Sequence, residues 1–243
     1  MLTYATITNV GGRKINEDAI GVSKKDDRYC FMLCDGLGSH GKGEVASNLV
    51  KDVFLFNFTN SDDKPVNFIK KTFLTAQNEL LQKQKEEKSH QKMKTTAVCL
   101  YTDIKKAYLG YVGDSRFYAF ANNKVKLQSK DHSVPYMLYL SKEISESEIR
   151  NHPDRNMLLK VMGTPWEGKS YEILKPMPLK KYQAFLLCTD GFWELVTEEE
   201  MCSLLTISKT ADEWLKRMTE VVEKKGVSKE MDNFSAIAIF NDR

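Results

Sequence analysis

The sequence predicts an α+β protein in which mixed or antiparallel sheets carry helices on their faces. Short runs of aromatic and aliphatic residues recur along the chain, and each is typical of a buried strand. The predicted order is strands, a helix pair, many strands, a second helix pair and a final strand, without the strict β-α alternation of a parallel doubly wound fold. A length of 243 residues is ordinary for one layered domain, so we expect a single domain over residues 1–243.

The strands are predicted where the apolar runs are short and continuous. They cover 28–34, 96–101, 107–112, 116–120, 184–189 and 235–240. The predicted helices cover 43–58, 65–86, 197–205 and 211–224.

The boundaries and faces of three helices can be justified residue by residue. Pro65 suits the first turn of the second helix, and Thr197 with Glu200 has the spacing of a capping box. Apolar residues recur at steps of three and four in the second helix, at Val66, Ile69, Phe73, Ala76 and Leu80. The last helix has an apolar face made of Trp214, Leu215, Met218, Val221 and Val222.

The segment 130–169 is polar, mixed in composition and interrupted by Pro135, Pro153 and Pro165. A connection of this length between strands is typical of an inserted flap or lid.

Composition and charge exclude several classes of function. The net charge of +3 gives no field that would attract nucleic acid or a membrane surface. No apolar stretch approaches 18 residues and no secretion signal opens the chain, so we expect neither export nor membrane insertion. The cysteines are odd in number and mostly lie in apolar runs, which predicts free thiols and a cytoplasmic location. They are Cys30, Cys34, Cys99, Cys188 and Cys202.

Carboxylates recur where the predicted strands run out. Asp35, Asp114 and Asp190 each follow an apolar run, and Asp232 stands just before the last one. The stretch "NEDA" at 16–19 adds further acidic residues. Clustered carboxylates repel one another unless cations lie among them, and magnesium and manganese prefer oxygen ligands. The pattern therefore predicts a divalent metal site at the rim of the sheets.

An Asp-Gly pair is also a strong signal for a tight turn. At Asp35-Gly36 we expect a turn that leads from the end of a core strand toward a helix, with the Gly36 carbonyl free to approach an ion. At Asp114 the following "SRFYAF" looks like a return strand, so a hairpin turn and a functional site both stay open.

Eight motifs in order resemble the metal-dependent protein phosphatase family, that is protein phosphatase 2C-like enzymes of the bacterial type. The resemblance covers about residues 4–240. The motifs are "GGRKINED", "CDGLGSHGKGEVAS", "TTAVCL", "VGDSRFYAF", "KDHSV", "HPDRNMLLKVMG", "LLCTDGFWELVTEEE" and "DNFSAIAIF". The resemblance implies a four-layer α-β-β-α sandwich of two antiparallel sheets flanked by helix pairs, with a flap at about 133–157.

The resemblance also implies a centre of two Mg²⁺ or Mn²⁺ ions at one end of the sandwich. Asp35 would bridge the ions, the Gly36 carbonyl would bind one of them, and Asp190 and Asp232 would ligate the other. Glu17 and Asp18 would hold metal-bound waters or complete the second ion's shell. Asp114 would form a third metal site together with Asp190.

The implied reaction is hydrolysis of phosphoserine and phosphothreonine in proteins by a hydroxide that bridges the two ions. Arg13 would grip the substrate phosphate through its planar fork. The implied partners are phosphorylated proteins, a cognate serine/threonine kinase and its substrates. We expect the protein itself to be a monomer. Alternatives are a phosphatase dedicated to one regulatory phosphoprotein, or a pseudophosphatase that binds phosphoproteins without turnover.

The proton donor for the leaving oxygen stays unassigned. Several eukaryotic members of the family have His after the Asp-Gly pair, whereas Leu37 stands here. Candidates are a metal-bound water and His40. We interpret His132 and His152 as structural or flap-anchoring residues, and Phe192 and Trp193 as packing residues.

Overall fold

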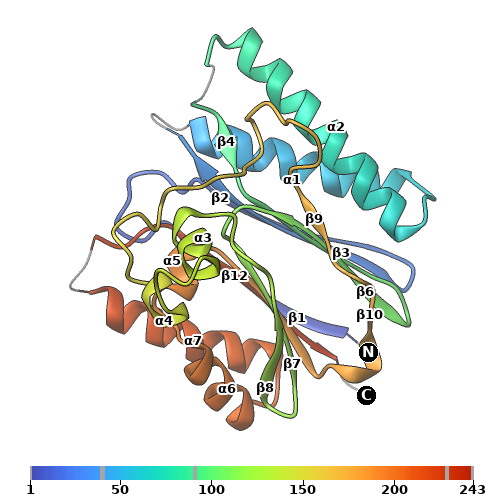
Figure 1. Ribbon diagram of the computed structural model, residues 1–243. Helices are drawn as coiled ribbons and strands as arrows, with labels where there is room; N and C mark the ends of the chain where they lie inside the picture. Colours follow the sequence, from blue (N-terminus) through green and yellow to red (C-terminus); the bar gives the residue numbers. More distant parts are fainter. Residues whose placement is uncertain (1, 39–41, 90–91, 228–229, 242–243) are drawn as a thin grey trace.

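Two antiparallel sheets face each other in the computed structural model, which describes residues 2–38, 42–89, 92–227 and 230–241 (Figure 1). The first sheet has the spatial order β1 (Leu2–Asn9), β12 (Phe234–Asn241), β11 (Ala184–Cys188), β7 (Arg116–Ala121) and β8 (Lys124–Gln128). The second has the order β10 (Met177–Pro178), β6 (Lys106–Val112), β5 (Ala97–Thr102), β3 (Arg28–Leu37) and β2 (Asp18–Lys25). The short strands β4 (Lys94–Thr95) and β9 (Glu172–Ile173) pair with β3 and β6.

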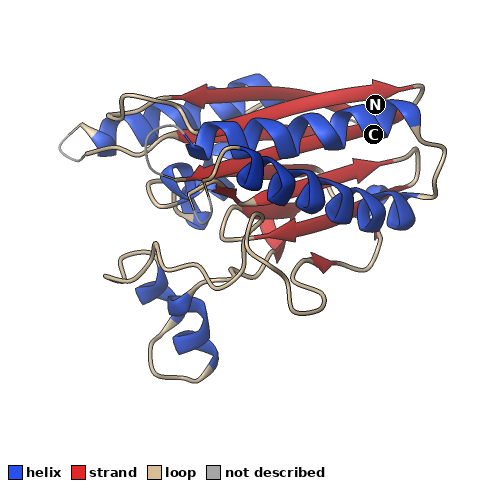
Figure 2. Cartoon of the chain, turned by 90° about the horizontal axis from the view of Figure 1, so that it is seen from above, coloured by secondary structure: helices blue, strands red, loops and turns tan. Residues whose placement is uncertain are grey.

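Helices cover the outer face of each sheet. The second sheet is covered by α1 (Lys42–Asn60) and α2 (Pro65–Glu86), and the first by α6 (Glu198–Ile207) and α7 (Ala211–Gly226). Figure 2 shows the long helices running alongside the strands. The four layers of the predicted α-β-β-α sandwich are thereby confirmed.

Alternation along β3 shows how one strand serves two layers. Cys30, Met32 and Cys34 belong to the core cluster beneath α1 and α2, whereas Phe31 and Leu33 belong to the cluster between the sheets. Successive side chains of a strand point to opposite faces, so a strand buried on both faces is apolar throughout. This explains why the apolar runs were readable as core strands.

The predicted helix signals are confirmed. Pro65 occupies the first turn of α2, and Thr197 caps α6 in a capping box with Glu200. On α7 the buried side chains include Trp214 and Met218. The sequence patterns therefore located all four long helices to within a few residues.

The structure adds elements that the patterns did not show. The edge strands β1, β2 and β8 were not predicted, because their partly exposed faces mix polar and apolar residues. Within the predicted flap the chain forms α3 (Val134–Leu140) and α4 (Glu146–Ile149), which stand out from the layers in Figure 2. Two short turns complete the set, α5 (Asp190–Trp193) and the 3-10 turn η1 (Leu179–Lys181).

All five cysteines are free thiols, as predicted. Across the described ranges, no helix combines the length and the apolar character that a membrane crossing requires.

Candidate metal centre

The predicted carboxylates meet at one end of the sandwich, where β3 and β11 end and β12 begins. Asp18 at the start of β2 is the register partner of Asp35 near the end of β3, which places both side chains on one face of the sheet. The carboxyl of Asp190 lies close enough to that of Asp35 to raise the pKa of Asp35 by charge repulsion. Asp114 and Asp232 both lie close enough to Asp190 to repel it electrostatically. The two sheets thus contribute carboxylates to the same space.

The expected turn at Asp35-Gly36 is wrong. β3 continues through both residues to Leu37, and Gly36 pairs with Thr95 of β4. The added pairing with β4 keeps the backbone extended, so the acidic side chain is presented by a strand.

The hairpin interpretation at Asp114 is wrong as well. β6 and β7, which flank Asp114, belong to different sheets. Gly113 has a φ of +104°, a conformation that glycine adopts without steric cost, and it turns the chain from one sheet to the other. Asp114 therefore lies at the crossover between the sheets.

Gly36 allows a close approach of three backbone segments. A Cβ at this position would lie 2.3 Å from the Gly43 oxygen and 2.4 Å from the Glu17 oxygen. The Gly43 N–H also donates to Glu17 Oε1 at 3.1 Å. The start of α1, the end of β3 and the residue before β2 are consequently packed backbone against backbone.

The local electrostatics favour a bound cation. Burial raises the pKa of Asp18 to about 7, and Asp190 and Asp232 add repulsion. Burial and the negative neighbours also raise the pKa values of Asp35, Asp114 and Asp190. Four acids with raised pKa values at one place are the signature of charges that lack compensation.

A basic side chain sits at the rim of the cluster. Arg13 donates from Nε and Nη2 to the two oxygens of Asp232, at 3.0 and 2.9 Å. This hydrogen bonding raises the pKa of Arg13. Both side chains of the pair are about half exposed, so the guanidinium can be reached from solvent.

A cavity of about 400 Å³ opens over the cluster. Among the predicted site residues, those that line it are Arg13, Glu17, Asp35, Gly36, Asp114, Asp190 and Asp232. Asp18 is buried behind this surface and is 7 % exposed. The structure thus brings every predicted site residue to the cavity wall or directly behind it.

The donor set fits a hard divalent ion. Within the described ranges, no three His, Cys, Asp or Glu side chains are placed so that they could hold a metal ion without moving. The Asp232 carboxyl is instead paired with the Arg13 guanidinium. Asp18 Oδ1 is buried, and no hydrogen-bond partner for it is found among the described residues. Such an arrangement is costly, and a cation or its water shell would relieve it.

Asn233 is a site residue that the sequence did not single out. Its Oδ1 accepts the Glu17 N–H at 2.8 Å, and its Nδ2 donates to the carbonyls of Val10 and Ile15. One amide thereby ties the segment that carries Arg13 to the end of the chain that carries Asp232. Its place next to Asp232 in "DNFSAIAIF" was the available signal.

Two of the histidines have structural roles, as interpreted from the sequence. The Gly113 N–H donates to His132 Nδ1 at 3.1 Å, and burial lowers the pKa of His132 to about 4. His152 Nδ1 accepts the Asp154 N–H. His40, the candidate proton donor, lies outside the described residues, and the side chain that follows the Asp-Gly pair at the cavity wall is Leu37.

Comparisons with known proteins agree with the geometry. The family model for protein phosphatase 2C matches residues 10–234. The serine/threonine phosphatase stp of Listeria monocytogenes is 30% identical over 207 residues, which cover 83% of this chain and 81% of that protein.

Solved structures extend the likeness to the whole chain. The serine/threonine phosphatase Stp1 from Staphylococcus aureus has a TM-score of 0.88 and 29% identity, and the match covers 100% of this chain and 96% of that chain. The catalytic domain of the protein phosphatase PstP in complex with two manganese ions has a TM-score of 0.80 and 22% identity, covering 98% and 97% of the two chains. The second likeness concerns the fold alone.

Proposed function

Because the chain belongs to the protein phosphatase 2C family of metal-dependent serine/threonine phosphatases, we propose that it hydrolyses phosphoserine and phosphothreonine in proteins with two Mn²⁺ or Mg²⁺ ions. The observation that carries the proposal is the set of buried and half-buried acids around one cavity, most of them with raised pKa values, together with an unpartnered Asp18 oxygen. A fold that served only as a scaffold would gain stability by losing these charges.

The residues that would hold the ions are those that the family resemblance implies, and all of them line the cavity except Asp18, which is buried. Asp35 would contact both ions, the Gly36 carbonyl one of them, and Asp190 and Asp232 the other. Glu17 and Asp18 would complete the shell through water, and Asp114 would serve a third ion together with Asp190. When bound, a pair of such ions lowers the pKa of water and neutralises charge on the phosphoryl oxygens.

Arg13 would bind the substrate phosphate. Its guanidinium presents planar donors that match two phosphate oxygens, and Asp232 holds it at the rim of the cavity. Asp232 takes the Nε proton and one Nη2 proton, so the donors left for phosphate are the two N–H of Nη1 and the second N–H of Nη2. The guanidinium is thereby oriented before the substrate arrives, which reduces the entropy cost of binding.

Leu37 brings no proton to the leaving oxygen of serine or threonine. We assign this step to water in the cavity.

The wider setting is part of the proposal. The substrates would be phosphorylated proteins, and a cognate serine/threonine kinase would be a partner. The protein would act in the cytoplasm, where free thiols such as its five cysteines persist. The acting unit would be a monomer with one phosphatase domain, residues 1–243, and a flap at 133–157.

Turnover of a phosphothreonine peptide and of para-nitrophenyl phosphate tests the proposal. Hydrolysis with Mn²⁺, its loss in chelator and its loss in Asp190→Ala are the expected results. Equal rates in all three conditions would refute the metal mechanism. Saturable binding of the phosphopeptide without turnover at any metal concentration would instead identify a pseudophosphatase.

A further inference from the structure

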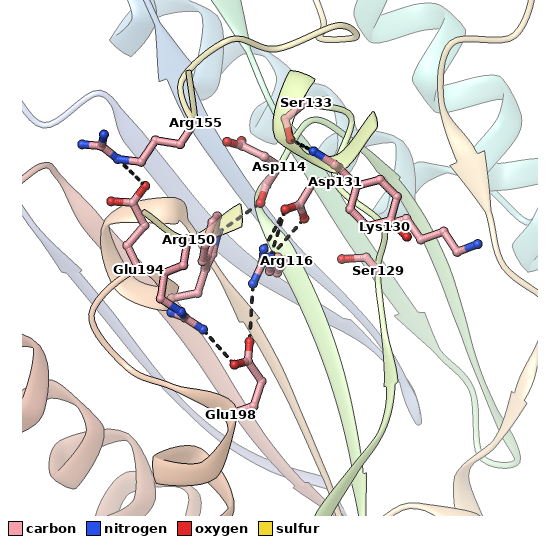
Figure 3. A network of polar contacts seen from close by, with 12 residues as sticks. Asp114, Arg116, Ser129, Lys130, Asp131, Ser133, Arg150, Arg155, Glu194 and Glu198 are labelled. Atoms are coloured by element: carbon pink, nitrogen blue, oxygen red, sulfur yellow. Dashed lines mark hydrogen bonds and ion pairs between the residues drawn. The ribbon is translucent and has the colours of Figure 1, made fainter. Parts of the chain in front are cut away.

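The flap segment, residues 133–157, is fastened to the turn that follows Asp190. Arg150, directly after α4, donates to Glu198 Oε2 at 2.8 Å and to the Val196 carbonyl at 3.3 Å. Only 16 % of its side chain is exposed. Figure 3 shows Arg150 and Glu198 meeting below Asp114 and Arg116. A second flap residue, Arg155, pairs with Glu194 at the end of α5 at 2.9 Å, but its side chain is 40 % exposed, so the mostly buried contact of the two is that of Arg150.

Trp193 lies next to this contact, and two arginine side chains lie over its ring. The Arg116 guanidinium carbon lies 3.5 Å from the centroid of the Trp193 ring, and the Arg150 guanidinium carbon lies 5.4 Å from it. Cations over an indole face are attracted by its quadrupole, and more strongly where water is excluded. Trp193 is 2 % exposed, so this condition is met.

Glu198 keeps the two guanidinium groups together. It accepts from Arg116 Nη1 at 3.4 Å as well as from Arg150, and the Tyr118 hydroxyl donates to it at 2.8 Å. Burial alone would raise the pKa of Glu198, yet Arg150, Tyr118 and Arg116 hold it below its usual value. The carboxylate therefore stays charged between its cations.

The same tryptophan holds the backbone of a proposed metal ligand. Trp193 Nε1 donates to the main-chain carbonyl of Asp114 at 3.1 Å, in a buried position. Asp114 stands at the crossover between the sheets. It directly follows Gly113, whose φ of +104° is a conformation that residues with a side chain rarely adopt. An indole that tilts would release this carbonyl and let the Asp114 carboxyl move.

We propose that Arg150 is a positioning residue through which docking of the flap fixes Asp114. It acts by contacting the Trp193 ring from the flap, while Arg116 of β7 contacts the same ring. Arg116 is itself fixed by Asp131, to which its Nη2 donates at 2.7 Å. The contact that depends on docking of the flap is therefore the one between Arg150 and Trp193. The inference rests on the proposed function only for the role of Asp114.

The first test compares Arg150→Met with the wild type on two substrates. Para-nitrophenyl phosphate is too small to need the flap as a binding surface. We expect kcat to fall about tenfold on it and on a phosphothreonine peptide, with KM for the small substrate nearly unchanged. Arg150→Lys keeps a cation beside Glu198 and should recover most of kcat. A rise in KM for the peptide, without loss of kcat on the small substrate, would overturn the proposal.

Lys169→Met is the matched control. Lys169 also lies over an aromatic ring, 5.6 Å from the centroid of Tyr171, and pairs with a carboxylate, Glu172, at 3.7 Å. It contacts neither α5 nor α6 in these interactions. Its kcat and KM should equal those of the wild type, and an equal loss in both variants would point to a general effect of removing a surface cation.

The second test does not depend on turnover. The chain has three tryptophans, so the indole N–H signal of Trp193 can be assigned by NMR with Trp193→Phe. In Arg150→Met its hydrogen exchange should be about tenfold faster, and in Lys169→Met unchanged. Unchanged protection of the Trp193 indole N–H in Arg150→Met would refute the positioning role, whether or not the wild type is active. If the wild type is inactive but exchange is faster in Arg150→Met, only the proposed function is refuted.

Discussion

Asp18 and Asp35 face each other directly across β2 and β3, with Asp18 buried and Asp35 half-buried at the cavity wall. Like charges directly opposite on a sheet destabilise it. Asp35→Asn keeps the shape and removes one charge. We expect it to raise the free energy of unfolding in chelator by about 1 kcal/mol at pH 7, and to lower turnover about 100-fold.

Thermal unfolding in chelator and steady-state kinetics measure the two effects. Asp52→Asn is the control, because Asp52 pairs with Lys51 on the exposed side of α1. It should change neither quantity. A less stable Asp35→Asn protein would mean that Asp35 stabilises the fold by itself.

The stability of the chelated protein should fall as the pH rises. The pKa of Asp18 is raised in the folded state to about 7, so the folded protein binds a proton that the unfolded chain has lost. This contribution is complete below the unfolded pKa and disappears as the pH rises through about 7. The measurement is the difference in unfolding free energy between Asp18→Asn and wild type from pH 5 to pH 8.

That difference should grow with pH in favour of Asp18→Asn, by a few kcal/mol at most. The buried His132, whose pKa is lowered, has the opposite dependence but is present in both proteins and cancels. A difference that stays constant over the range would show that Asp18 keeps an ordinary pKa.

Gly36→Ala should be strongly destabilising. Its Cβ would meet backbone oxygens of Gly43 and Glu17, which cannot move without shifting α1 or β2. We expect a loss of about 1–3 kcal/mol in denaturant unfolding. Gly21→Ala on β2 is the control, because the nearest atoms that its Cβ would meet belong to the side chains of Leu55 and Lys51, which can move more easily than backbone, and its cost should be smaller. Equal costs would contradict the close packing inferred at Gly36.

Arg13→Lys separates phosphate binding from stability. Lysine keeps the charge but loses the paired donors, so the inhibition constant of inorganic phosphate should rise about tenfold. The unfolding free energy should change by less than about 0.5 kcal/mol, because the pair with Asp232 is half exposed. Unchanged phosphate inhibition would exclude Arg13 from the phosphate site.

The sequence was most informative where apolar side chains recur with a simple period. Strands such as β3 are buried on both faces and α7 carries one apolar stripe, so both were visible as patterns. The edge strand β1 alternates only weakly and could not be distinguished from a loop. The recurrence of Asp at strand ends correctly indicated residues that converge in space.

The missing parts depend on contacts between distant segments. β3 runs on through Asp35-Gly36 because β4, some 60 residues later, pairs with it, and local turn preferences cannot show this. Trp193 was interpreted as a packing residue, and its hydrogen bond to the Asp114 carbonyl depends on how two sheets meet. Long-range pairing is thus what the local patterns lacked.

Calorimetric titration with Mn²⁺ most directly tests the claim that these carboxylates form a metal centre. The account predicts saturable binding of at least two ions per chain, turnover that rises with occupancy, and an affinity weakened about tenfold or more in Asp190→Asn. Absence of saturable Mn²⁺ binding in a chain that still hydrolyses phosphothreonine would contradict it.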